Sequence, residues 1–231
     1  MLSAKLLSEN LRLTTDMPKL KNYETIVWDF NGTIIDDVNA AVGAVNDMLI
    51  KRSQPTIDLA RYRSEVDIPI SRFYDKVFLP GTIDFSDAIV EFDRGYDKYL
   101  ADDPVMPGAL QMLCRFKSMG KHQIIVSASN IEKVTDQLSK YSLLEYFDKV
   151  LARSDFNVED KTYLAQNYFR EKEINPDTSV VIGDCVADWQ MSRGLCCDCI
   201  LTTNGHQSRE DLEATDAVVI DNLTELLNLI C

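Results

Sequence analysis

The sequence lacks several features that would place it in a specialised class of protein. No apolar run reaches the roughly 18 residues of a membrane-spanning helix, so we expect no membrane segment. The 24 Lys and Arg residues are outnumbered by 37 Asp and Glu residues, a net charge of −13. The chain therefore lacks the basic excess with which proteins bind nucleic-acid phosphates, and we expect no nucleic-acid partner. Internal repeats and low-complexity segments are also missing.

Two further absences concern the compartment. Six Cys occur, but the cluster "CCDC" at 196–199 lacks the second CxxC pair of a typical zinc site. We predict that these thiols lie in the core or at a strand edge in a reducing cytosol. Residues 1–22 lack the continuous apolar centre of a secretory signal. We expect an N-terminal extension with a short helix packed on the domain, and a cytoplasmic location.

What the sequence does contain is an alternation of short apolar runs with helical patterns, typical of a parallel sheet covered on both faces. We predict strands at 25–30, 122–128, 149–152, 179–184, 199–203 and 217–221. Helical patterns lie between them at 109–120, 131–147 and 161–173. At 231 residues and 45% hydrophobic content the chain can form a substantial core. The predicted fold is α/β, with a Rossmann-like parallel sheet.

One segment, residues 38–104, departs from the alternation because it contains only helical patterns. An insertion after the first strand would lie over the carboxyl ends of the strands, where it could act as a lid. We therefore predict an N-terminal extension at 1–22, a core domain formed by 23–37 and 105–231, and a helical cap domain at 38–104.

Polar residues follow several of the predicted strands. Asp29, Gly32 and Thr33 follow the first, Ser127 and Ala128 end the second, Lys161 opens a helix, and Asp184 and Asp188 follow a later strand. A carboxylate among apolar neighbours needs a partner, a metal or a reaction. Carboxylate oxygens suit Mg²⁺, and a free carboxylate beside a Lys and Mg²⁺ would form a phosphoryl-transfer site. Each residue alone also has an ordinary structural interpretation, such as a helix cap or a solvated Lys.

Taken together, these motifs resemble the haloacid dehalogenase superfamily, and specifically its phosphoglycolate-phosphatase-like branch with a helical cap. "DFNGT" at 29–33 resembles the motif Asp-x-Asp-Gly-Thr with its second Asp replaced. Ser127 in "IIVSAS" matches the second motif, Lys161 is the candidate for the third, and "GDCVAD" at 183–188 matches the fourth. Lys161 lacks the Pro that usually follows it in the family. The resemblance covers residues 23–231.

The resemblance implies roles for these residues. Asp29 would attack phosphorus and form an aspartyl-phosphate. Mg²⁺ would be held by Asp29, the backbone carbonyl of Asn31, Asp184 and Asp188. The phosphate of a small-molecule substrate would be bound by Gly32, Thr33, Ser127, Ala128 and Lys161. The cap would exclude water and select the substrate, with Arg52, Arg61, Arg63 and Arg72 as candidate anion contacts.

Position 31 departs from the family pattern, because Asn stands where the family's phosphatases carry the acid/base Asp. An amide neither donates a proton to a leaving group nor activates water, and such help is typically worth ~10²–10⁴-fold. We expect a phosphoric monoester hydrolase that is slow or restricted to good leaving groups, such as acyl phosphates.

Two alternatives remain open at this point. One is a phosphate-binding regulatory pseudoenzyme with little turnover, which Asn31 favours. The other is a different reaction, either dehalogenation or phosphonate cleavage through a Schiff base on Lys51. The intact carboxylate set disfavours both the pseudoenzyme and a metal-free dehalogenase. We expect a monomer or a homodimer.

Overall fold

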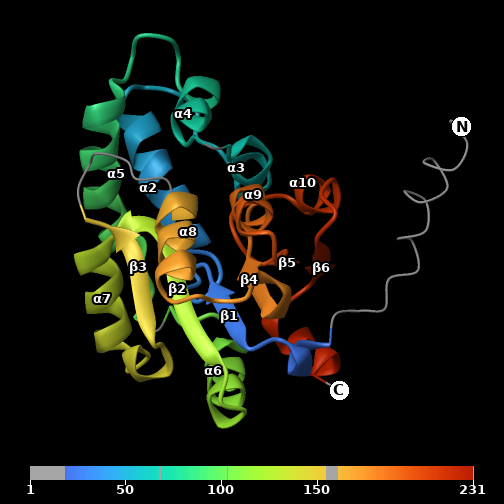
Figure 1. Ribbon diagram of the computed structural model, residues 1–231. Coiled ribbons are helices and arrows are strands. Elements are labelled where there is room, and N and C mark those ends of the chain that lie inside the picture. Colours follow the sequence, from blue (N-terminus) through green and yellow to red (C-terminus); the bar gives the residue numbers. More distant parts are fainter. Residues whose placement is uncertain (1–18, 68, 103, 155–160, 231) are drawn as a thin grey trace, which may run out of the picture.

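The sheet at the centre of the protein has six strands, and every neighbouring pair is parallel (Figure 1). The computed structural model describes residues 19–67, 69–102, 104–154 and 161–230. The strands are β1 (Thr25–Trp28), β2 (His122–Asn130), β3 (Lys149–Arg153), β4 (Ser179–Gly183), β5 (Asp198–Thr202) and β6 (Val218–Ile220), in the order β3-β2-β1-β4-β5-β6. Strand β1 therefore lies in the interior of the sheet, between β2 and β4. The predicted α/β fold is confirmed, and each predicted strand segment overlaps one of these strands.

Helices cover both faces of the sheet. They are α6 (Ala109–Ser118), α7 (Ile131–Lys140), α8 (Lys161–Glu171), α9 (Val186–Leu195) and α10 (Arg209–Glu213), with short 3₁₀ segments η2 (Leu20–Asn22), η3 (Leu144–Tyr146), η4 (Pro176–Thr178) and η5 (Leu223–Leu229). Trp28 packs with α6 and α7 in one cluster, whereas Val27 packs with α8 and α9 in another. Successive strand residues point to opposite faces, so both faces of β1 are buried.

Between β1 and α6 the chain forms four helices, and no strand occurs among the described residues of this segment. They are α2 (Val38–Lys51), α3 (Leu59–Glu65), α4 (Ser71–Val77) and α5 (Phe85–Tyr99). Their buried side chains, among them Val45, Tyr62 and Phe73, form a hydrophobic cluster made only of residues from this insertion. Figure 1 shows α2, α4 and α5 grouped beyond one end of the strands, with α3 next to them and closer to α9.

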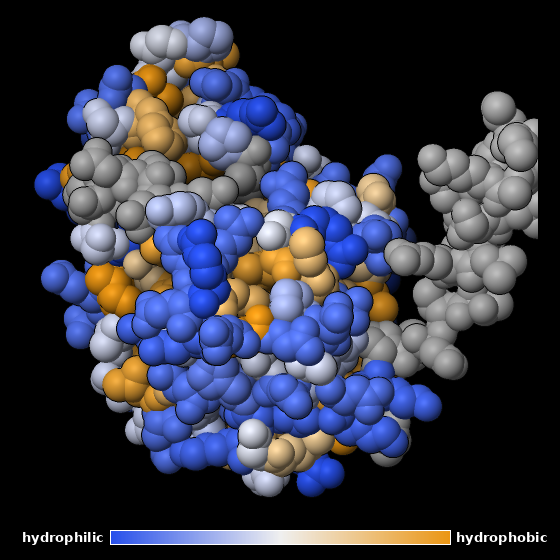
Figure 2. All heavy atoms as spheres, in the orientation of Figure 1, coloured by the Kyte–Doolittle hydropathy of each residue, from blue (hydrophilic) through white to orange (hydrophobic). Residues whose placement is uncertain are grey.

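The surface of the protein is largely hydrophilic in the view of Figure 2, with hydrophobic residues visible on the helical insertion. The most exposed large hydrophobic side chains belong to this insertion: Leu79 is 62% exposed and Ile50 61%. Among the described helices, none combines the length and the apolar character needed to cross a membrane.

One local prediction differs from the structure, and another lies mostly outside the described residues. The helix expected over 131–147 ends at Lys140, because Ser142 adopts a left-handed backbone with φ 56°, and η3 follows instead. The helix expected in the N-terminal extension falls on residues outside the described part, apart from the short segment η2. Leu20 of that segment is fully buried in the core.

Candidate active site

The two predicted strand-end carboxylates lie at the same edge of the sheet. Asp29 directly follows β1, and Asp184 directly follows β4. The N–H of Asp29 donates to the carbonyl of Ile182 at 2.9 Å, which continues the pairing of the two strands. Because the strands are parallel, both carboxylates are placed at their carboxyl ends, where α/β sheets bind ligands.

Lys161, the first residue of α8, connects two of the acidic residues. Its Nζ lies 2.8 Å from Oδ1 of Asp29 and 2.5 Å from Oδ1 of Asp188. The three side chains are 11%, 10% and 0% exposed respectively, so the ammonium group is shielded from water on most sides. The structure thus brings together three residues that the sequence places 132 and 27 positions apart.

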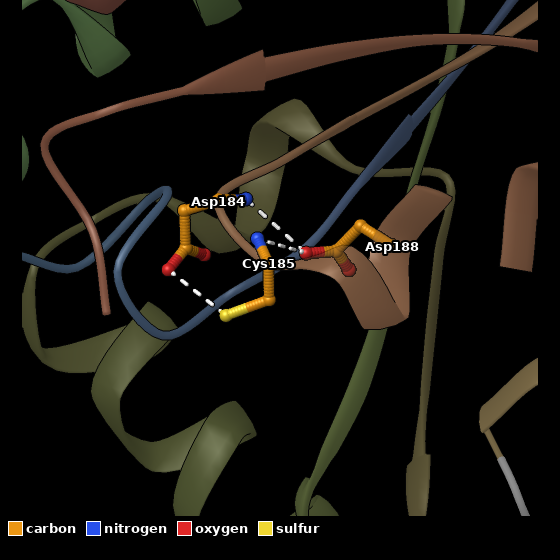
Figure 3. Close-up of side chains that lie close together, drawn as sticks. All are labelled: Asp184, Cys185 and Asp188. Carbon is orange, nitrogen blue, oxygen red and sulfur yellow. Dashed lines mark hydrogen bonds between the residues drawn. The ribbon is translucent and has the colours of Figure 1, made fainter. Parts of the chain in front are cut away.

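The two carboxylate oxygens of Asp188 have different partners, one in the candidate site and the other in the first turn of α9. Oδ1 binds Lys161, whereas Oδ2 accepts hydrogen bonds from the N–H groups of Asp184 and Cys185 at 3.1 and 3.0 Å (Figure 3). Asp188 therefore closes the first turn of α9, as N-terminal acidic side chains commonly do. A Cβ added to Gly183 would lie 2.3 Å from Cγ of Asp188, so this turn requires glycine.

Asp184 is fully buried and held by groups from two other loops. Thr33 donates its hydroxyl to Oδ1 at 2.8 Å, and the N–H of His206 donates to Oδ2 at 2.7 Å. The loop after β5 can approach this closely because Gly205 has no side chain: an added Cβ would lie 2.1 Å from Oδ2 of Asp184. The orientation of Asp184 is therefore fixed by its surroundings.

Negative charge exceeds positive charge among these buried groups. Burial raises the pKa of Asp29, as does the charge of Asp188, while Lys161 opposes this rise. Burial also raises the pKa of Asp184. For Lys161 burial favours the neutral amine, but Asp188 and Asp29 outweigh it and raise the pKa well above its usual value. Lys161 pairs with two of these three carboxyl groups, while His206 opposes the rise in the pKa of Asp184. A divalent cation would balance the remaining excess of carboxyl groups.

The donor atoms at the site fit a hard cation. Donor atoms of Asp184, Cys185 and Asp188 lie within 4.8 Å of one another (Figure 3). Burial, followed by the charge of Asp184, raises the pKa of the Cys185 thiol well above its usual value, so a thiolate is unfavourable here in the free protein. The remaining donors are carboxylate oxygens, which suit Mg²⁺ rather than a metal that prefers sulfur.

The residues predicted to hold phosphate lie in the loop after β1 and at the end of β2. Gly32 has φ +73°, and a Cβ there would lie 2.4 Å from Asp184 Oδ2, so only glycine fits. Ser127 is buried, and its hydroxyl accepts a hydrogen bond from the N–H of Ser129 at 3.0 Å. Ala128 is exposed. Because Ile125 pairs with Trp28, these β2 residues lie at the same sheet edge as Asp29.

Sequence reasoning missed a buried network beside Asn31. Asp37 accepts hydrogen bonds from Asn31 Nδ2 at 2.8 Å and from the Tyr96 hydroxyl at 2.8 Å, and His206 Nε2 lies 3.1 Å away. His206 Nδ1 lies 2.9 Å from the hydroxyl of Tyr62. Burial opposes both charges, yet His206 lowers the pKa of Asp37, and Asp37 raises that of His206 to about 9. The position of His206 just after a predicted strand was a signal that could have revealed it.

Three of the four candidate anion contacts on the helical insertion, Arg52, Arg63 and Arg72, have side-chain partners within the protein. Arg52 forms an ion pair with Glu91 at 2.8 Å, and Arg63 donates to the backbone carbonyls of Asn204 and Gly205. Lys51 also pairs with Glu91, at 3.1 Å. It ends α2, about 20 Å along the helix from the first residue of α2. This placement disfavours Schiff-base chemistry on Lys51.

The protein has a doubly wound parallel sheet, a helical insertion after the first strand and an acidic site at the strand ends. These features are typical of α/β proteins, which bind ligands at the carboxyl ends of their strands. The family model described as "Haloacid dehalogenase-like hydrolase" matches residues 26–202, and the chain belongs to this family. The family predicted from the motifs is thus confirmed.

Known proteins of similar length support a phosphatase. The chain is 21% identical over 210 residues to "Probable phosphatase IndB" of Dickeya dadantii, covering 87% of this chain and 91% of that protein. It is 25% identical over 224 residues to "Phosphoglycolate phosphatase 1" of Pseudomonas aeruginosa, covering 92% and 80%. A haloacid dehalogenase-like family protein from Streptococcus pneumoniae has the same fold, with a TM-score of 0.77, 16% identity, and 91% and 99% coverage.

Proposed function

We propose that this protein is a Mg²⁺-dependent phosphatase that hydrolyses a small phosphorylated metabolite through an aspartyl-phosphate on Asp29. The observation that carries the proposal is the contact of Lys161 with both Asp29 and Asp188 at the carboxyl edge of the sheet. A buried carboxylate beside a cation and further carboxylates is suited to nucleophilic attack on phosphorus. The relatives named as phosphatases agree with this proposal.

The residues would act as follows. Lys161 binds Oδ1 of Asp29, and we assign the attack on phosphorus to Oδ2. The new P–O bond forms as the bond to the leaving group breaks, and the leaving oxygen keeps the electron pair. Water then attacks the phosphorus of the aspartyl-phosphate, which releases phosphate and restores the carboxylate. Ser127, Lys161 and the N–H groups of the nucleophile loop would hold the phosphoryl oxygens.

We propose that Mg²⁺ binds Asp29, Asp184, Asp188 and the backbone carbonyl of Asn31, the oxygen-rich set described above. Bound Mg²⁺ would offset the charge of the phosphoryl oxygens. We also propose that residues 38–104 act as the cap. Their separate hydrophobic cluster and their contacts with the loop after β5 support this role.

Asn31 limits the choice of substrate. Its amide cannot protonate a leaving group, so substrates whose leaving group departs as a stable anion are favoured. Acyl phosphates have this property, and alkyl phosphate esters do not. Phosphoglycolate belongs in any substrate panel because of the names of the relatives.

The test is phosphate release from acetyl phosphate, phosphoglycolate and other phosphate esters, with and without Mg²⁺, by the unchanged protein and by Asp29→Asn. We expect Mg²⁺-dependent release that Asp29→Asn abolishes. The matched control is Asp47→Asn, which removes a carboxylate from the helical insertion that pairs with Lys98, and it should retain turnover. Turnover that survives Asp29→Asn would refute the assignment of the nucleophile.

A phosphate-binding regulatory protein is the second candidate, and the amide at position 31 is the observation that favours it. Calorimetry with inorganic phosphate and Mg²⁺ separates the two functions. Phosphate binding without release from any substrate in the panel would support the regulatory protein instead of the phosphatase.

A further inference from the structure

The amide of Asn31 is held at both of its polar atoms. Ser129 donates its hydroxyl to Oδ1 at 2.7 Å, and Nδ2 donates to Oδ2 of Asp37 at 2.8 Å. A carboxylate can only accept hydrogen bonds, so the nitrogen must face Asp37 and the oxygen must face Ser129. The orientation of the amide is therefore set by Asp37.

Asp37 is 2% exposed, and each of its two carboxylate oxygens has two hydrogen-bond partners. Its Oδ1 lies 2.8 Å from the N–H of Gly32 and 3.1 Å from Nε2 of His206. Its Oδ2 accepts from Asn31 and from the Tyr96 hydroxyl, both at 2.8 Å. Each of these four groups has a hydrogen to donate to the carboxylate.

A carboxylate at position 31 would break this pattern. Its oxygen would replace Nδ2 at 2.8 Å from Oδ2 of Asp37, and with both groups ionised no hydrogen would lie between the two acceptors. Asp37 is buried and position 31 is only partly exposed, so a second carboxylate at this distance would repel Asp37 with little screening by water. The acid that position 31 lacks could not be introduced without a change at position 37.

We propose that Asn31 and Asp37 are a matched pair, in which Asp37 positions the amide and prevents a carboxylate at position 31 from acting as the acid/base. This inference rests on the proposed function and deepens it. The pair explains why the site is suited to leaving groups that need no proton. Acid/base chemistry at position 31 would return only if the amide and the carboxylate exchanged places.

The double variant, Asn31→Asp combined with Asp37→Asn, exchanges the two groups and satisfies the same contacts. The amide oxygen at position 37, in the place of Oδ1, would accept from Gly32 and His206, as the carboxylate does now. The amide nitrogen, in the place of Oδ2, would donate to the new carboxylate at position 31 and to the Tyr96 oxygen, which can accept as well as donate. In Asp37→Asn alone, Asn31 could flip and let the Ser129 hydroxyl act as acceptor, but the carboxylate that pairs with His206 would be lost.

Stability tests the pair without any reference to turnover. Urea unfolding in EDTA would compare the unchanged protein with Asn31→Asp, Asp37→Asn and the double variant. We expect Asn31→Asp to raise the unfolding equilibrium constant at least about tenfold, and the double variant to recover most of that loss. The control is Asn39→Asp, an exposed position two residues from Asp37, which adds the same charge and should change little. Asn31→Asp as stable as the unchanged protein would overturn the proposal.

Turnover provides the second measurement. The ratio of kcat for an alkyl phosphate ester to kcat for acetyl phosphate should rise about 100-fold in the double variant. In Asn31→Asp alone it should rise by less than about tenfold, and Asn39→Asp should leave it unchanged. The full rise in Asn31→Asp alone would overturn the pairing. If none of the proteins releases phosphate from acetyl phosphate, the proposed function fails, while the unfolding comparison still decides the pairing.

Discussion

Lys161 donates to carboxylates that reach it from two different elements, Asp29 after β1 and Asp188 in α9. Both carboxylates are buried, and so is the ammonium group. A buried ion pair is costly to break from one side, because the remaining charge has neither water nor a partner. In the free protein the fold at this edge of the sheet therefore depends on the same residue that would bind substrate phosphate.

Lys161→Met tests this dependence. Removing the ammonium group leaves two buried carboxylates facing each other, and we expect a loss of about 3 kcal/mol in the free energy of unfolding. Urea unfolding in EDTA measures it. Lys98→Met is the control, because Lys98 is 61% exposed in its pair with Asp47 and its loss should fall within the error of the measurement. Equal effects of the two substitutions would contradict the interpretation.

The residues at the strand ends could be predicted because local sequence determines them: an apolar run, a Gly and a carboxylate mark the end of a buried strand. Asp37 and His206 could not be predicted as partners, because 169 positions separate them. Only the packing of the loop after β5 against the loop after β1 brings them together. The sequence also contains no signal that Asn31 donates to Asp37, since this depends on how the chain leaves β1.

Helix α5 connects the insertion to the candidate site through its last turns. Tyr96 is buried and donates to Asp37 of the core, whereas Tyr99 donates to Asp47 within the insertion. The two hydroxyls on this helix thus have different roles. The Tyr96 hydroxyl fastens the insertion to the segment after β1, and the Tyr99 hydroxyl stabilises the insertion itself. This difference makes the two residues a natural pair for mutation.

We expect Tyr96→Phe to lower the free energy of unfolding by about 1–2 kcal/mol, because a buried carboxylate loses one of its donors. The substitution should also make α5 exchange its amide hydrogens faster, which mass spectrometry can follow. Tyr99→Phe, which removes the same atom from a side chain that is 39% exposed, should leave both quantities nearly unchanged. Faster exchange in Tyr99→Phe alone would show that Tyr96 does not fasten α5.

The predicted strands and helices agree with the structure where the hydrophobic pattern is strong. They agree less well where the backbone conformation of a single residue ends a helix. The strands follow from runs such as Val180 to Ile182, whose burial on both faces requires continuous apolar sequence. The helix expected over 131–147 was wrong in its second half. Its spacing is helical, but Ser142 adopts a positive φ, and the chain turns back toward β3. Propensity does not reveal such a turn, since tertiary packing imposes it.

For the whole molecule, the buried acidic groups of the candidate site predict that a divalent cation stabilises the fold. A ligand that binds only the folded state adds about 2.7 kcal/mol at 100 times its dissociation constant. For a chain of this size we expect a rise in Tm of roughly 5–10 °C with saturating Mg²⁺. Differential scanning calorimetry in EDTA and in Mg²⁺ measures the shift.

The shift should disappear in Asp184→Asn and persist in Asp47→Asn, which lies outside the site. A Tm that does not respond to Mg²⁺ in the unchanged protein would contradict the proposed metal site. The number of subunits, expected to be one or two, can be measured on the same samples by light scattering.

The place of β1 inside the sheet has a consequence for synthesis on the ribosome. The strand that precedes Asp29 is made first, but its partners β2 and β4 begin only at His122 and Ser179. At 5–20 residues per second, β4 follows about 150 residues later, after roughly 10–30 s. The helical insertion has its own apolar cluster and is complete long before then. The nascent chain would thus carry a folded insertion while the strand that leads to Asp29 waits for β2 from the middle third and for β4 from the last third of the protein.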